Sequence, residues 1–570
     1  MAWTARLLLL ALVILGWYSY KTLKYYRIKQ NEGVPQPPPN IFLGHMKVIG
    51  EFYRKGDIRR HIDYVFMSVA KSVGTNSICL FDVRPASYII CVVLSHEVAE
   101  QISRATKLHP WSTPKSPTMT DVKPIVGSHS IIMAQGETWK GLRKRYNAGF
   151  APQHIMSLLS RIVEKTSLFL DVLDAHARAG DEFTLDHPCV NLTFDIIGAV
   201  VMDMDFDAQR PKSEQSDIVR HYSDLLSSFT DDNGAGWLYA NPFLKRHQYR
   251  LGRAVDSAIK SAIKQKFAEM KAATKSTRAR SVLALSLQDV DEMDEEVLQI
   301  TADQVKSFLF AGHDTTSILL QWTFYELSRS PRVLATLRAE LDDVLGRDAD
   351  PRTVLLARGE DAVKRLTYTS AVIKEILRLY PPAGTARMAP KGTNFFIKLP
   401  EGKEVCLDGM VIYNCATAIQ RDPAVYGDTG DDFVPERWLG DTDTHDVGEN
   451  GVDTAEKPRV NGNEDAKVPA GAWRPFERGP RNCIGQELAN LEARVILACA
   501  VRRYDFVKVG MGELALDEKG RPVENAKGQY EVKNTASYCQ TGGSYADAGQ
   551  ASSATVAEET VLAIVFENFE

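Results

Sequence analysis

The sequence predicts a mainly α fold with small β-sheets, joined at its N-terminus to a single membrane-spanning helix. Helical hydrophobic patterns dominate from about residue 40 onward, and short β-like segments occur near Ser77–Cys91, Asn394–Leu399 and Val561–Phe566. An uncharged apolar run, Leu7–Tyr20, precedes this body. Taken alone, a run of this length could be the core of a signal peptide, and the residues around it favour a membrane anchor.

Composition and charge exclude several classes of protein. The 570 residues include 68 Lys and Arg against 73 Asp and Glu, a formal charge of -5, and 44% are hydrophobic. These are the values of an ordinary globular chain, so wholesale disorder and a multi-pass membrane protein are excluded. The near-neutral charge also argues against a chain that mainly binds nucleic acid, because phosphates require a concentrated basic face.

The N-terminal run has the features of a retained membrane anchor. Ala2 to Tyr20 is nineteen residues, or ~28 Å as a helix, which is close to the thickness of a hydrocarbon core. Four bases and no acid lie between positions 21 and 29, so the positive-inside rule places the rest of the chain in the cytosol. A cleaved signal peptide is the alternative, but no small-x-small cleavage site follows the run.

We therefore divide the chain into an anchor with its basic flank (1–30), a proline-rich hinge (31–40) and one large domain (41–570). The prolines of the hinge favour an extended, semi-rigid spacer that holds the domain at a fixed pose over the membrane. Two stretches of the domain, 440–472 and 536–558, contain too few apolar residues to form a core. We predict flexible surface insertions at both.

Residues Thr301–Ser328 form the clearest long helix, with apolar side chains on nearly every face. Such a helix is buried, so we expect it to cross the interior of the domain. Its middle, at 311–316, reads Ala-Gly-His-Asp-Thr-Thr. A glycine inside a helix costs ~1 kcal/mol relative to alanine, and an unpaired buried carboxylate costs more. Either Asp314 and Thr315 transfer protons while Gly312 opens the helix face, or the small residues serve a helix contact with a polar kink.

A glycine-bearing loop is predicted to deliver one sulfur to the start of a helix. Residues 476–485 read Phe-Glu-Arg-Gly-Pro-Arg-Asn-Cys-Ile-Gly, and a helical stretch follows. At a helix N-terminus, the free N–H groups and the macrodipole favour a thiolate over a thiol at Cys483. No Cys-x-x-Cys occurs and the nearest other cysteine is Cys499, so a zinc or iron–sulfur site would need ligands from afar. A single thiolate suits a metal that brings its other ligands with it, and haem is such a case.

This loop resembles the Phe-x-x-Gly-x-Arg-x-Cys-x-Gly loop of the cytochrome P450 superfamily, in its microsomal, fungal type. The resemblance implies that family's fold, with haem b between the long central helix and the cysteine loop, and Cys483 as the axial ligand of the haem iron. Phe476, Arg481 and Gly485 would contact the haem. Glu477 departs from the family pattern, which usually has a small or polar residue there. The departure is expected to alter the proximal surface and to leave the ligand intact.

Basic and aromatic residues from three segments are expected at the carboxylate edge of the haem. Gly136–Arg145 resembles the Trp-x-x-x-Arg helix of the family, which makes Trp139 and Arg143 ligands of the haem propionates. Arg387 and Arg481 would join them, because guanidinium groups pair well with carboxylates. The bases of the helix could equally form a solvated face, or a docking surface for an acidic electron-transfer partner.

Two further motifs match the family in the order that it requires. The central helix would supply protons to dioxygen, with Asp314 as the acid and Thr315 as the hydroxyl donor. Glu375, Arg378 and Arg437 would form a buried ion-pair network that braces the cysteine loop. Without the resemblance, the Glu375–Arg378 spacing predicts only a surface ion pair of about 0.2–0.5 kcal/mol.

The resemblance implies a haem-dependent monooxygenase that inserts one oxygen atom from O2 into a small or medium apolar molecule, by hydroxylation or epoxidation, in fungal secondary metabolism. Electrons would come from NADPH–cytochrome P450 reductase, with cytochrome b5 as a further candidate donor, at the endoplasmic reticulum membrane. A haem-thiolate isomerase or dehydratase, and a non-catalytic haem sensor or membrane scaffold, are the alternatives. Substrate contacts are expected near Thr106–Ala134 and Ser227–Pro242, where no motif identifies the substrate.

Overall fold

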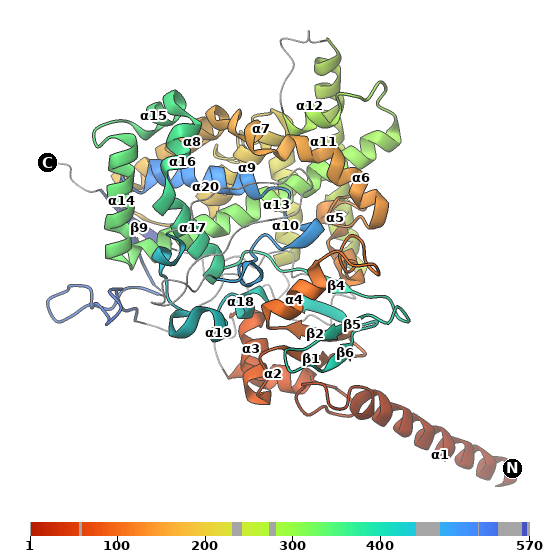
Figure 1. Ribbon diagram of the computed structural model, residues 1–570. Helices are drawn as coiled ribbons and strands as arrows, with labels where there is room; N and C mark the ends of the chain where they lie inside the picture. Colours follow the sequence, from red (N-terminus) through yellow and green to blue (C-terminus); the bar gives the residue numbers. More distant parts are fainter. Residues whose placement is uncertain are drawn as a thin grey trace.

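The computed structural model describes residues 2–55, 60–230, 242–272, 281–439, 468–510, 512–533 and 561–566. Helices form most of this part of the chain, and its strands form three small sheets (Figure 1). The predicted mainly α class with small sheets is therefore confirmed. Most of the predicted insertion at 440–472 and all of that at 536–558 lie outside the described residues.

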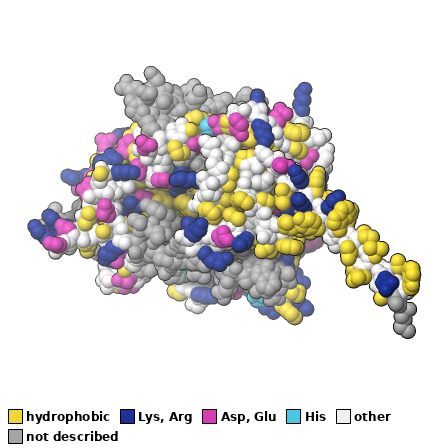
Figure 2. All heavy atoms as spheres, turned by 90° about the horizontal axis from the view of Figure 1, so that it is seen from below, with side chains coloured by type: hydrophobic (Ala, Val, Ile, Leu, Met, Phe, Trp, Pro, Cys, Tyr) yellow, Lys and Arg dark blue, Asp and Glu magenta, His cyan; other side chains and the backbone are white. Residues whose placement is uncertain are grey.

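The N-terminal helix α1 (Ala2–Lys24) projects from the body and continues into a π-helical turn, η1 (Tyr25–Lys29) (Figure 1). Its apolar side chains are exposed, and the segment Trp3–Lys29 is long and apolar enough to cross a membrane. Figure 2 shows hydrophobic side chains along α1 and on the adjoining face of the body. These features agree with the predicted membrane anchor.

A buried ion pair fixes the junction between the anchor and the body. Arg27 Nη1 in η1 lies 2.7 Å from Asp82 Oδ1, and the two side chains are only 7% and 4% exposed. Arg27 also donates to the carbonyl oxygens of Phe42 (3.0 Å) and Arg84 (2.6 Å). Gly44, with φ +56°, makes room for this contact, because a Cβ there would lie 2.2 Å from the Asp82 carbonyl oxygen. The pose of α1 thus depends on Arg27, ahead of the segment predicted as a hinge.

The largest sheet lies beside the root of the anchor (Figure 1). Its strand order is β1-β2-β7-β4, with β2 and β7 parallel and the other neighbours antiparallel. The bounds are β1 (Ile78–Asp82), β2 (Ile89–Val93), β4 (Ala386–Met388) and β7 (Val411–Asn414), with β5 (Phe396–Lys398) and β6 (Glu404–Cys406) as a separate pair and β3 (Glu182–Thr184), β8 (Tyr504–Lys508) and β9 (Val561–Phe566) as a third sheet. All four strands of the largest sheet are buried throughout, so both of its faces are covered.

The helices assemble mainly on the other side of the molecule (Figure 1). Their bounds are α2 (Met46–Arg54), α3 (Ile62–Val73), α4 (His96–Ser103), α5 (Lys123–Val126), α6 (Gly136–Asn147), α7 (Pro152–Met156), α8 (Leu159–Ala179), α9 (Asp186–Met202), α10 (Asp217–Thr230), α11 (Pro242–Ala272), α12 (Val282–Ser286), α13 (Glu295–Ser328), α14 (Pro331–Leu345), α15 (Pro351–Arg358), α16 (Glu360–Arg365), α17 (Thr367–Leu379), α18 (Ala416–Ile419), α19 (Pro423–Tyr426) and α20 (Gln486–Ala500). Short 3-10 turns are η2 (Pro117–Val122), η3 (Ala148–Phe150), η5 (Gly427–Thr429), η6 (Pro435–Trp438), η7 (Ala470–Ala472) and η8 (Gly479–Arg481).

The long helix α13 crosses the interior, as the sequence predicts. The Asp294 side chain caps its start by accepting a hydrogen bond from the Val297 N–H at 2.7 Å. Gly312 in its middle packs against α9, because a Cβ there would lie 2.7 Å from the Ile197 side chain. The glycine is therefore explained by close helix packing, and the idea that it also opens a face of α13 stays a prediction.

Candidate functional site

Cys483 lies in a closed loop, three residues before α20 begins. Its N–H donates to the Phe476 carbonyl oxygen at 2.8 Å, which joins the two ends of the loop. Gly479 has φ +75°, and a Cβ there would lie 2.2 Å from the Ser103 carbonyl oxygen. Only glycine fits this position, so the loop holds the sulfur in one place at the start of the helix.

The Cys483 sulfur has protein close to it but is accessible on one side. Its side chain is exposed, whereas the other described cysteines are buried or partly buried. Burial raises the pKa of the Cys483 thiol, against the opposing effects of the Gly485 and Gln486 N–H groups and the Arg143 cation. The N–H groups at the helix start therefore favour the thiolate, but burial outweighs them. A bound metal ion would reverse this balance, because coordinated thiols are deprotonated.

One face of α13 borders open space near its middle. Between positions 301 and 324, every residue is buried except Ala311, Gly312 and Thr315. Ala311 and Thr315 are one turn apart and share a face, and the Thr315 hydroxyl donates to the Ala311 carbonyl oxygen at 2.7 Å. Asp314 next to them is 8% exposed. The two residues predicted to transfer protons thus lie together at the accessible part of the helix.

A buried carboxylic acid that no sequence motif singles out joins α13 to the helix after Cys483. Thr316 Oγ1 on α13 donates to Glu492 Oε1 on α20 at 2.7 Å. Burial raises the pKa of Glu492 to about 8, although the bond from Thr316 acts in the opposite direction. The accessible face of α13 is therefore held at a fixed position relative to the cysteine loop.

The predicted tryptophan and arginines of the haem edge form one group beside the loop. Trp139 on α6 is buried, and the Arg481 guanidinium lies 5.0 Å from its ring centroid. Arg481 also donates to the Ala134 carbonyl oxygen at 2.9 Å. Arg143 on the same helix donates to the carbonyl oxygen (2.6 Å) and side-chain oxygen (2.9 Å) of Asn482. Two donors of Arg143 thus support the loop directly.

Arg387 on β4 is fully buried and has almost no partners in the described part of the chain. Nη1 lies 3.4 Å from the Thr113 carbonyl oxygen, a long hydrogen bond, and Nε and Nη2 have no partner. Burial lowers the pKa of Arg387, and Glu477 partly offsets that effect. A buried cation with two free donors requires an anionic partner.

Lys115 lies beside Arg387, and no sequence motif points to it. The two residues form an isolated antiparallel bridge, and Lys115 Nζ donates to Thr385 Oγ1 at 2.6 Å. Burial lowers the pKa of Lys115 well below its usual range, and the cations of Arg387 and Arg481 lower it further. It falls within the stretch predicted to contact substrate, but the structure groups it with the predicted haem-edge cations.

The residues present fit a ligand that carries a metal and carboxylates. The accessible sulfur offers one metal ligand, and no group of three or more His, Cys, Asp or Glu in the described ranges could hold a metal by itself. The free donors of Arg387 suit a carboxylate. A Cβ at Gly485 would meet only the Cys483 sulfur, at 3.8 Å, so the backbone there leaves room for a flat group. Haem meets all of these requirements.

The predicted supporting residues form one buried network. Arg378 donates to both oxygens of Glu375 (2.9 and 2.8 Å), and Arg437 Nε donates to Glu375 Oε1 at 3.0 Å. Both Arg378 and Glu375 are fully buried. Burial by itself would raise the pKa of Glu375, but the two arginines lower it below its usual value. The surface ion pair, which was the alternative for this motif, is excluded.

Aromatic side chains connect this network to the cysteine loop. Trp438 Nε1 donates to Glu375 Oε2 at 2.8 Å, and the Trp438 ring lies 6.1 Å from that of Trp473. Trp473 in turn lies 6.1 Å from Phe476, whose carbonyl oxygen accepts the bond from Cys483. The contacts from Glu375 to the sulfur are therefore continuous.

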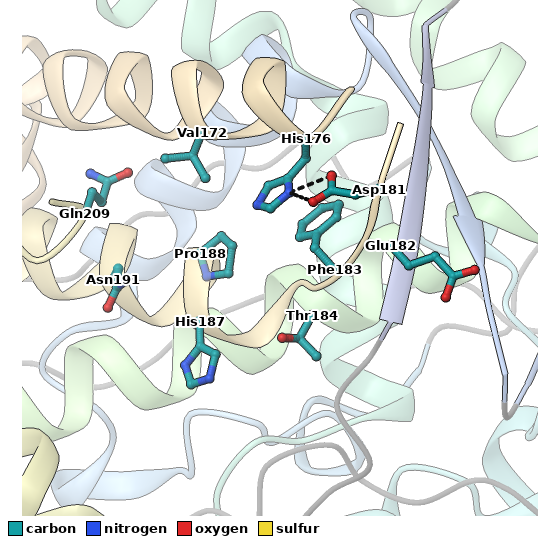
Figure 3. A pocket seen from close by; sticks show the side chains of 10 residues that line it. All are labelled: Val172, His176, Asp181, Glu182, Phe183, Thr184, His187, Pro188, Asn191 and Gln209. Atoms are coloured by element: carbon teal, nitrogen blue, oxygen red, sulfur yellow. Dashed lines mark hydrogen bonds and ion pairs between the residues drawn. The ribbon is translucent and has the colours of Figure 1, made fainter. Parts of the chain in front are cut away.

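A separate pocket of about 570 Å³ lies between α8, β3 and α9 (Figure 3). In it, His176 stacks on Phe183 with ring centroids 4.1 Å apart, and His176 Nδ1 lies 3.0 Å from Asp181 Oδ1. None of the predicted site residues lines this pocket. It is therefore distinct from the site around Cys483.

Comparisons with known proteins agree on one family. The family model for cytochrome P450 matches residues 34–529. Cytochrome P450 monooxygenase acrF of Aspergillus aculeatus is 33% identical over 429 residues, which cover 73% of this chain and 81% of that protein. Cytochrome P450 monooxygenase polC of Polytolypa hystricis is 28% identical over 506 residues, covering 85% and 84%. The crystal structure of the cytochrome P450DA heme domain matches with a TM-score of 0.65 at 18% identity, over 94% of this chain and 97% of that one, which confirms the predicted fold.

Proposed function

This chain belongs to the cytochrome P450 family and is a monooxygenase of that family, and from this premise we propose that it binds haem b through the Cys483 thiolate and inserts one oxygen atom from O2 into an apolar substrate. The observation that carries the proposal is the accessible Cys483 sulfur at the start of α20, in a structure that also holds a buried arginine, Arg387, with two free donors. The haem, once bound, supplies the chemistry of oxygen activation.

The protein's own residues would hold the haem at two places. Cys483 would bind the iron, and the loop that fixes its backbone would keep the sulfur at a constant position. Trp139, Arg143, Arg387 and Arg481 would bind the carboxylates, with Arg387 contributing the donors that the protein leaves unused. Phe476 and Gly485 would contact the ring from the side of the loop.

Asp314 and Thr315 would move protons into the space that α13 borders. The Thr315 hydroxyl has one proton and two lone pairs, and it now donates to the Ala311 carbonyl oxygen. Its oxygen can still accept a hydrogen bond, and rotation about the Cβ–Oγ1 bond can turn its proton toward the open space. Asp314 would restore that proton from solvent.

The electron donors that we propose are NADPH–cytochrome P450 reductase and cytochrome b5. Members of this family use a reductase partner, and Lys140 and Lys144 on α6 are exposed on the helix that also contacts the cysteine loop. An acidic partner could dock there by charge complementarity. With α1 in the endoplasmic reticulum membrane, exposed Phe42 (75%) and Leu43 (47%) near its root would also meet the lipid surface, and the body would be cytosolic.

The substrate that we propose is a small or medium apolar molecule, hydroxylated or epoxidised in fungal secondary metabolism. We expect apolar side chains of α13 and of the stretch before α6 to contact such a substrate. Part of the second stretch predicted to contact substrate, 231–241, lies outside the described residues. Metabolite profiling of a deletion strain, with spectral titration of candidate substrates, would identify it.

The carbon monoxide difference spectrum of the reduced protein tests the proposal. We expect the spectrum typical of thiolate ligation from the purified parent protein, and we expect Cys483→Ala to lose it and at least 99% of the activity. Cys499→Ala on α20 is the matched control, because that buried cysteine lies away from the open space and its loss leaves the spectrum unchanged. NADPH-dependent oxygen consumption distinguishes a monooxygenase from an isomerase. A thiolate spectrum that persists in C483A would contradict the proposal.

A further inference from the structure

Glu477 lies inside the cysteine loop, and its backbone conformation is unfavourable for its side chain. Its φ is +55°, in the left-handed region that favours glycine. For other residues this conformation costs on the order of 1 kcal/mol. Its side chain is only 18% exposed, so most of its contacts are with the interior and not with the proximal surface. The contacts of that side chain explain why a glutamate occupies the position.

The Glu477 carboxylate connects three segments that are far apart in the sequence. Oε2 accepts hydrogen bonds from Ser103 Oγ at the end of α4 (3.0 Å) and from Arg474 Nη2 (3.5 Å). Oε1 accepts from Asn414 Nδ2 at the end of β7 (3.0 Å). The Arg474 side chain is fully buried. The carboxylate therefore ties the cysteine loop to both neighbours.

The same carboxylate lies close to two of the cations predicted to face the haem edge. Asn414, which donates to it, ends β7; β7 pairs with β4, which carries Arg387, and Arg387 is bridged to Lys115. Burial would raise the pKa of Glu477, but Arg474, Arg387 and the hydrogen bonds outweigh it and lower the pKa to about 2, so the group stays ionised. Its charge also acts on Lys115 and on Arg387. It therefore partly neutralises the positive potential that these two cations create.

We propose that Glu477 is a positioning residue that sets the reduction potential of the bound haem, by holding one fixed negative charge beside the cations of the haem edge. The proposal rests on the proposed function, because it requires haem next to Arg387. Reduction adds one electron to the haem. A nearby negative charge disfavours that step, and a nearby positive charge favours it.

Removal of the charge should therefore make the haem easier to reduce. For E477Q, which keeps the shape of the side chain, we expect the ferrous-to-ferric ratio at a fixed electrode potential to rise about three- to tenfold. With about 59 mV per tenfold for one electron, the midpoint potential rises by ~30 to ~60 mV. E477D keeps the charge, and its potential should stay at the parent value.

The experiment is a spectroscopic redox titration of the purified holoenzymes. Asp174→Asn is the matched control, because Asp174 is also a partly buried carboxylate paired with an arginine, Arg503, and with Tyr504, but on α8. Its potential should not change. E477G is a second test variant, since it removes the charge and suits the left-handed backbone. It therefore relieves a backbone strain that the parent and E477Q share, which offsets part of the stability lost with the Arg474 contact.

The outcomes separate this inference from the proposed function. If the parent protein lacks the thiolate-type spectrum with carbon monoxide, the proposed function fails. If the parent has that spectrum but E477Q and E477G keep the parent potential, only the role of Glu477 is refuted. An equal rise in D174N, or failure of both Glu477 variants to bind haem, also refutes it, because the residue would then act through folding or through total charge.

Discussion

Arg378 and Arg387 are both fully buried, yet the protein treats the two cations in opposite ways. Arg378 donates to both oxygens of Glu375 and to three carbonyl oxygens, those of Gln420, Gly430 and Asp432. Arg387 has one long bond to a carbonyl oxygen and two nitrogens without a partner. Burial acts to lower the pKa of both arginines. Glu375 outweighs this effect at Arg378 and raises its pKa above the usual value, whereas the pKa of Arg387 stays lowered.

This difference separates an arginine that builds the fold from one that awaits a ligand. Replacing a buried cation whose donors are all used breaks native hydrogen bonds and leaves their acceptors unpaired. A buried cation with free donors lowers the stability of the protein until an anion binds to it. Unused hydrogen-bond donors on a buried cation therefore indicate a binding role better than its burial or its charge does.

The largest loss of stability is expected when the complete network is broken. Arg378→Met leaves three carbonyl oxygens without a donor and leaves Glu375 with one cation, so we expect the free energy of unfolding to fall by about 3–5 kcal/mol. Denaturant unfolding of the purified protein measures this change. The matched control is Arg352→Met, whose pair with Asp350 is partly exposed (33% and 41%) and should contribute less than about 1 kcal/mol. Equal losses in the two variants would mean that completeness of the network is unimportant.

The partners of Arg378 can be predicted from the sequence better than those of Arg387. Glu375 and Arg378 are three residues apart on one helix, so their contact is local and follows from helix geometry. The surroundings of Arg387 arise from the bridge to Lys115, 272 positions away along the chain. No periodic pattern announces such a contact, because β4 has only three residues. Long-range pairing of short strands is the part of the site that sequence patterns cannot supply.

The same contrast applies to the fold and to the loop. The sequence predicts the long helix α13 because a continuous apolar pattern needs no tertiary information, but it does not predict strands of three or four residues such as β4, β6 and β7. The cysteine loop was predicted from its glycines and the helix after it. The buried position of Glu477 was not predictable, because Ser103 and Asn414, which enclose it, come from other segments.

A second comparison, between the two buried acids Glu375 and Glu492, predicts a change in stability that depends on pH. Glu375 is paired with arginines and its pKa is lowered, while Glu492 accepts one bond from Thr316 and its pKa rises from 4.5 to about 8. A raised carboxyl pKa means that the folded state binds a proton more tightly than the unfolded state. Stability is therefore lost as pH rises from about 4.5 to about 8, on the order of a few kcal/mol in total.

Glu492→Gln removes this proton linkage and keeps an oxygen that can accept from Thr316. We expect E492Q to match the parent protein near pH 5 and to unfold at higher denaturant concentration than the parent near pH 8. Denaturant unfolding at a series of pH values between these limits provides the measurement, and the pH 5 values serve as the control. A constant difference between the two proteins at every pH would show that Glu492 does not titrate in this range.

The smallest change in stability is expected at the arginine that has free donors. Arg387→Met replaces a buried cation with an apolar side chain of similar length and leaves no strong acceptor without its donor. We expect thermal unfolding of protein produced without haem to change by less than about 1 kcal/mol, with stabilisation as the favoured direction, because the desolvation penalty of the cation disappears. Transfer of haem to an acceptor protein should become about tenfold faster, because the variant lacks one of the arginines that bind the haem carboxylates. A loss of 3 kcal/mol in the haem-free protein, equal to that of R378M, would remove the distinction between the two arginines, and unchanged haem transfer would remove the binding role of Arg387.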